Sequence, residues 1–116
     1  MRPDLLTVTE RVVSLRGQTA LGTPPHDLLD RIDDALAEGY ARALAGDAWS
    51  MLGEERLHEL LSDTDAPLRE RQIRALTSEH AGFERELVAL RRQLAELRRD
   101  RDRLNAGRPA RPVGST

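Results

Sequence analysis

The chain has 116 residues, which is enough for one small domain with a modest hydrophobic core. Hydrophobic residues make up 39% of it and charged residues 33%, with one Trp, one Tyr and one Phe, a balance that favours surface-rich helices over a sheet sandwich. The net charge is −2, and the absence of Cys excludes disulfides and thiolate-held zinc or iron–sulfur clusters.

The first residues, "MRPDLLTVTERVV", carry Asp4 and Glu10 where a signal peptide needs an apolar run. No stretch approaches the roughly 18 consecutive apolar residues of a membrane-spanning helix. We therefore expect a soluble cytoplasmic protein.

Residues 4–16 are predicted to form a short helix. Leu5, Val8, Val12 and Leu15 recur every three or four residues, which is the spacing of one helix face. Gly17 is predicted to end this helix, and the following residues to Pro25 are predicted to form a loop, because two consecutive prolines cannot lie inside a helix.

A second amphipathic helix is predicted after Thr23, which can cap it, with Pro24 at its first position. Gly46 and Asp47 predict a stop followed by a new N-cap, so that a further helix extends to about Ser62. The predicted core of this N-terminal unit consists of Leu28, Ile32, Leu36, Tyr40, Leu44, Trp49, Leu57 and Leu60.

The last predicted helix covers about residues 66–105, and part of its length of about 60 Å should project beyond a small domain. It carries a heptad pattern that is typical of a coiled coil. The predicted seam consists of Ile73, Leu76, His80, Phe83, Leu87, Leu90, Leu94, Leu97 and Leu104, with Arg101 at one further a position.

A single helix cannot bury such a stripe on itself, so the seam must meet either a second copy or the preceding helices folded back. In a parallel homodimer Glu86 would face Arg91, whereas an antiparallel one would bring mostly acidic residues together. The flanking charges thus favour a parallel homodimer. His80 interrupts the seam, either to fix its register or as a pH switch in which two protonated imidazoles would repel.

Motifs that carry chemistry are sparse. Glu55 and His58 have the i, i+3 spacing of di-iron helical bundles, but a complete site would need a second such pair from a dimer. No nucleophile elbow, phosphate-binding Gly-rich loop or carboxylate pair in an apolar setting is present. The sequence therefore predicts no enzyme, no cofactor and no metal, with a Glu55/His58 metal site as an alternative.

The charges are unevenly distributed along the chain. Residues 1–70 contain seven Arg and fourteen acidic residues, whereas residues 91–116 contain eight Arg and three acidic residues. This asymmetry favours head-to-tail contact in an oligomer or an acidic partner at the C-terminal end. Nucleic-acid binding by the Arg-rich end is a further alternative, but Glu96, Asp100 and Asp102 are spaced to pair with nearby arginines along the helix.

Together these patterns predict an all-α protein: an N-terminal helical unit over residues 1–62, a coiled-coil helix over 63–105 and a disordered tail over 106–116. The predicted function is a non-enzymatic protein–protein interaction module. It would act as a coiled-coil homodimer that binds an unidentified protein, as a regulatory adaptor, anti-factor or scaffold component does.

Overall fold

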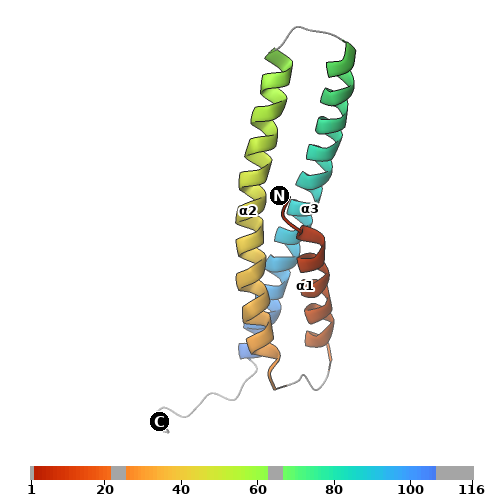
Figure 1. Cartoon of the computed structure of the whole chain (residues 1–116). Helices are drawn as coiled ribbons and strands as arrows, with labels where there is room; N and C mark the ends of the chain where they lie inside the picture. Colours follow the sequence, from red (N-terminus) through yellow and green to blue (C-terminus); the bar gives the residue numbers. More distant parts are fainter. Residues whose placement is uncertain (1, 22–25, 63–66, 107–116) are drawn as a thin grey trace.

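The computed structural model describes residues 2–21, 26–62 and 67–106, and within these ranges it contains three helices and no strand. They are α1 (Leu5–Thr19), α2 (Leu28–Ser62) and α3 (Pro67–Ala106). Helices α2 and α3 form a long antiparallel hairpin, and α1 packs along the half of it where α2 begins (Figure 1). The molecule measures 73 × 27 × 19 Å. The all-α prediction is confirmed.

Helix α1 begins where the sequence predicts. Asp4 is its N-cap and accepts a hydrogen bond from the Thr7 backbone N–H at 3.1 Å. Its four predicted apolar residues are all buried. The helix continues past Gly17 to Thr19, so the predicted stop was wrong by two residues: a Cβ at Gly17 would meet nothing within 4 Å, and no residue there needs the left-handed conformation.

Helix α2 is continuous through Gly46 and Asp47, and the predicted break at this point was wrong. Gly46 is buried against α3, and a Cβ atom there would lie 2.9 Å from Cδ1 of Leu87 and 3.5 Å from Cζ of Phe83. This glycine therefore serves close packing between two helices.

Two of the residues predicted for the core of α2 lie on its surface. Leu28, Ile32 and Leu36 are buried as expected, but Tyr40 is 41% exposed and Leu44 is 71% exposed. An α-helix turns by about 100° per residue, so a strict four-residue repeat drifts by about 40° at each step and leaves the buried face. The buried face continues instead through Ala35, Gly39, Ala43, Gly46 and Ser50.

The predicted seam of α3 lies in the core of the single chain. Its central members are 2% exposed or less and pack together with buried residues of α1 and α2; they are Phe83, Leu87, Leu90, Leu94 and Leu97. A parallel homodimer across this seam does not fit the arrangement, because α1 and α2 already cover it. The preceding helices fold back onto the seam, which is the other arrangement that the heptad pattern allows.

The two units predicted within residues 1–105 share this one core, since it draws residues from all three helices. Trp49 and Leu104 are partly buried and pack against it. Leu57, Leu60, Ile73, Leu76 and His80 are half-buried, in the part of the hairpin that extends beyond α1. The predicted tail starts at the last residue of α3, and residues 107–116 lie outside the described ranges.

The part of the chain that the structure describes contains no helix that is long and apolar enough to span a membrane.

Candidate functional site

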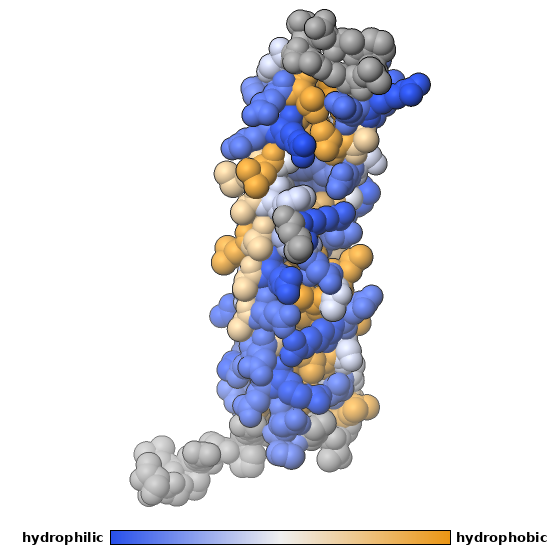
Figure 2. Space-filling model, in the orientation of Figure 1, coloured by the Kyte–Doolittle hydropathy of each residue, from blue (hydrophilic) through white to orange (hydrophobic). Residues whose placement is uncertain are grey.

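The solvent-facing side of α2 carries an unbroken apolar surface. We call it the outer α2 face. It consists of Ala37, Tyr40, Ala41, Leu44, Ala45, Ala48, Met51 and Leu52, all of them exposed. Its Leu and Met side chains are 59–71% exposed: Leu44 71%, Met51 63% and Leu52 59%. Tyr40 is 41% exposed. Figure 2 shows apolar colouring along the edge of the molecule that α2 occupies.

The helical repeat explains why these residues share one face. At about 100° per residue, positions 37, 41, 44, 48 and 51 lie within a narrow sector opposite the buried positions. The face extends over about 24 Å at 1.5 Å per residue. Contiguous exposed apolar surface of this kind is typical of an interaction site.

Both ends of the outer α2 face are acidic. Asp30, Asp33 and Asp34 lie before Ala37 on the same side of the helix, and Glu55 and Glu59 follow Leu52 there. All five carboxylates are exposed. The surface therefore combines an apolar centre with negative charge at either end.

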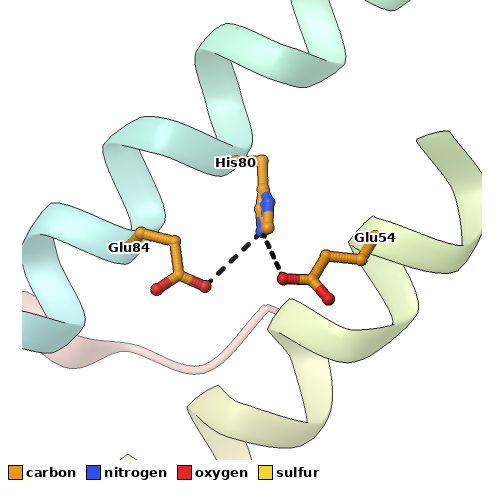
Figure 3. A group of neighbouring side chains, drawn as sticks. All are labelled: Glu54, His80 and Glu84. Carbon is orange, nitrogen blue, oxygen red and sulfur yellow. Dashed lines mark ion pairs between the residues drawn. The ribbon is translucent and has the colours of Figure 1, made fainter. Parts of the chain in front are cut away.

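A second candidate is a polar group between α2 and α3. His80 Nε2 lies 3.5 Å from Glu84 Oε1 and 3.9 Å from Glu54 Oε1, and the two carboxylates point toward the imidazole (Figure 3). Ser50, only 8% exposed, places its hydroxyl 3.2 Å from His80 Nε2 and donates a hydrogen bond to Glu84. Ser50 and His80 thus bring polar atoms into a helix interface that is otherwise mostly apolar.

The position of His80 bears on its predicted roles. Its ring contacts side chains of its own chain, Ser50, Glu54 and Glu84. Sequence reasoning singled out His80 and missed the two glutamates. The i, i+4 spacing of His80 and Glu84 was a visible signal, but the approach of Glu54 depends on how α2 and α3 are aligned.

We call Ser50, Glu54, His80 and Glu84 the His80 group. A pocket of about 240 Å³ lies beside it, where α1 no longer covers the hairpin. It is lined by Trp49, Ser50, Leu52, Gly53, Arg56, Leu76, Glu79, His80 and Phe83. Arg2, which precedes α1, contacts one of these lining residues: its guanidinium lies 5.1 Å from the centre of the Phe83 ring, and it pairs with Glu86 at 3.0 Å. The His80 group is therefore reachable from solvent through a mostly apolar opening.

The predicted metal alternative, Glu55 and His58, is placed differently. Both residues are exposed, and they line a shallow surface depression with Glu54 and Glu59. Within residues 2–21, 26–62 and 67–106, the group of metal-ligating side chains whose ligand atoms converge is Glu54, His80 and Glu84. Glu54, and not Glu55, faces a histidine of α3, namely His80.

Arginines of the C-terminal half of α3 form ion pairs within the chain. Arg99 pairs with Glu96 at 2.9 Å, as the helical spacing predicts. Arg91 pairs with Asp47 of α2, and Arg101 pairs with Asp33, whose hydrogen bond raises the pKa of Arg101. These pairs use positive charge that phosphate binding would need.

Comparisons with protein-family models, with curated proteins and with solved structures find no match to this chain.

Proposed function

We propose that this chain is a non-enzymatic protein–protein interaction module whose outer α2 face binds an amphipathic helix of a partner protein. The observation that carries the proposal is the exposure of Leu44, Met51 and Leu52 on one side of α2, within the outer α2 face, none of whose residues is charged. Full burial of side chains of this size stabilises a complex by about 1.5–3 kcal/mol each.

The small residues of this face suit a helical partner. Ala37, Ala41, Ala45 and Ala48 leave room for close approach of a second helix, while Leu44 and Met51 can insert between its side chains. A helix-in-groove contact of about 24 Å corresponds to roughly four turns of the partner.

The charges at the ends define the partner's chemistry. If α2 of a second copy lay on the outer α2 face, an antiparallel pair would bring Asp34 near Glu55, and a parallel pair would set each of these acids near its own equivalent. Like charges at such an edge are unfavourable. We therefore propose a partner helix with an apolar stripe and Lys or Arg at both ends.

This proposal retains the predicted function, a protein–protein interaction module, but assigns the contact to the outer α2 face instead of the seam of α3. A regulatory adaptor, an anti-factor or a scaffold component all act through binding of this sort, in the cytoplasm as the sequence leads us to expect. In this proposal the apolar seam of α3 stabilises the fold, and the outer α2 face contacts the partner protein.

Fluorescence anisotropy with two labelled synthetic helical peptides tests the proposal. Both peptides carry the same four-turn stripe of Leu and Ala, and one has Lys at its ends whereas the other has Glu. We expect the Lys-ended peptide to bind more tightly, and Leu44→Glu to weaken its binding by at least about tenfold, which corresponds to about 1.4 kcal/mol. Val88→Glu is the control, because Val88 is an exposed apolar residue of α3.

Equal binding of the two peptides, or no effect of Leu44→Glu, would contradict the proposal. Light scattering of the peptide-free protein is measured in parallel. A molar mass near twice 13.0 kDa that Leu44→Glu returns to 13.0 kDa would show that a second copy occupies the outer α2 face.

A further inference from the structure

We propose that Glu54, His80 and Glu84 bind a divalent transition-metal ion, with Zn²⁺ as the preferred ion. The three ligand atoms come from two helices and lie within 4.8 Å of one another (Figure 3). This inference is independent of the outer α2 face, which lies on another side of α2.

The distances fit a metal with little movement. Zinc binds imidazole nitrogen and carboxylate oxygen at about 2.0–2.2 Å, which places neighbouring ligands of a tetrahedral site about 3.4 Å apart. The pairs observed here are 3.5 Å for Glu84 and 3.9 Å for Glu54, each measured to His80 Nε2, and all three ligand atoms lie within 4.8 Å of one another, so the carboxylates must move somewhat closer together. Glu54 has a side chain that is 68% exposed and Glu84 one that is 44% exposed, so both can adjust their rotamers at small cost.

The ligand types select the ion. One imidazole with two carboxylates suits zinc and other first-row transition metals, whereas Mg²⁺ and Ca²⁺ prefer sites made of oxygen alone. Three protein ligands leave one tetrahedral position for water, as in open zinc sites.

Ser50 supports the site through a hydrogen bond to one of its ligands. Its hydroxyl donates to Glu84, which holds that carboxylate on the side facing His80. Groups that orient metal ligands in this way typically change metal affinity by about 10- to 100-fold. Ser50 is buried in the core face of α2, where an apolar residue would pack without the cost of a buried hydroxyl.

Charge also favours a cation here. Within the described part of the chain, the ion pairs found for Glu54 and Glu84 are with His80, which balances them only when its ring is protonated. With a neutral ring, the group holds two negative carboxylates and no positive charge. A divalent ion would neutralise both and would join α2 to α3 in the region that α1 does not cover.

The test is titration of the untagged, metal-free full chain with ZnCl₂ in competition with a chromophoric chelator. We expect one Zn²⁺ per chain. We expect His80→Gln and Glu84→Gln each to weaken binding by at least about tenfold, in line with the loss of one ligand. The matched control is the double variant Glu55→Gln/His58→Gln, which removes the neighbouring exposed pair and should leave the affinity unchanged. Circular dichroism of each variant checks that it is folded.

A second readout is the visible absorption of the Co²⁺-loaded protein, since tetrahedral Co²⁺ absorbs strongly and octahedral Co²⁺ weakly. We expect a tetrahedral spectrum that His80→Gln abolishes. Absence of stoichiometric Zn²⁺ binding by the wild type at tens of micromolar protein would overturn the proposal. So would binding that survives both His80→Gln and Glu84→Gln, or that only the control variant removes.

Discussion

Gly39 of α2 packs directly against Leu94 of α3, so that a Cβ atom at position 39 would overlap the Leu94 side chain. Leu94 has no exposed surface and is enclosed by the core, which leaves it little room to move away. The absence of a side chain at residue 39 therefore sets how closely the two long helices approach.

Gly39→Ala should lower the stability of the protein relative to a matched alanine substitution elsewhere in α2. Alanine gains about 1 kcal/mol over glycine in helix propensity, but overpacking typically costs about 1–3 kcal/mol. Gly53→Ala is the control, because a Cβ there meets nothing within 4 Å. We expect the free energies of unfolding in urea to differ by about 1–3 kcal/mol, with Gly53→Ala the more stable. Equal values would show that the Gly39 contact can relax without cost.

Leu94→Ala tests whether the seam of α3 belongs to the fold of one chain. Leu94 is completely buried among residues of its own chain, so its truncation should cost about 2–5 kcal/mol of unfolding free energy. Ala95→Asp, on the exposed side of the same helix, should cost about 1 kcal/mol or less, mainly through the lower helix propensity of Asp. Because the contacts lie within one chain, the urea midpoint should not depend on protein concentration. A midpoint that rises with concentration would show that the seam is shared between copies.

Much of the secondary structure could be predicted from local patterns. The buried face of α1 follows from the spacing of Leu5, Val8, Val12 and Leu15. The last helix was predicted over about 66–105 and is observed over Pro67–Ala106, because Gly107 and the prolines after it mark its end. These features depend on helix periodicity and end signals, which a sequence displays directly.

The errors arose where the meaning of a residue depends on another helix. Gly46 resembles a helix stop, but it is a contact point for Leu87, and only the packing of α2 on α3 distinguishes the two roles. Tyr40 and Leu44 continue a regular spacing that the 3.6-residue repeat carries away from the core.

The His80 group and the burial of the seam also depend on how one helix packs against another. The heptad pattern predicts that the seam is buried, and it does not specify which helix buries it. Glu54 lies close to His80 because α2 and α3 run side by side and these two positions are at the same level of the hairpin. This alignment is a result of tertiary packing and has no local signature.

Arg16→Met should destabilise the protein more than Arg11→Met. Arg16 joins α1 to α3 by donating to Asp100 at 3.1 Å and to Gln93 at 2.9 Å, and Asp100 is only 5% exposed. Loss of hydrogen bonds to a buried charged group costs about 1–3 kcal/mol. Arg11 pairs with Glu38 on the surface, where both side chains are well exposed and such pairs contribute about 0–1 kcal/mol. Chemical denaturation of the two variants measures the difference, and equal losses would contradict the role of Asp100 as a buried anchor.

Asp4 should make the stability of α1 depend on pH. Hydrogen bonds from Thr7, through its side chain and its backbone N–H, lower the pKa of Asp4 below its ordinary value of 3.8. A lowered pKa in the folded state means that the ionised cap adds stability above pH 3.8 and that this contribution is lost as the pH falls through the folded-state value. Asp4→Asn keeps a capping side chain that cannot ionise. The difference in unfolding free energy between the wild type and Asp4→Asn should therefore be constant from pH 7 to about pH 5 and should shrink toward zero as the pH falls further. Thermal unfolding followed by circular dichroism over this range measures it, and a difference that stays constant down to the lowest pH would show that the charge of Asp4 contributes nothing to the cap.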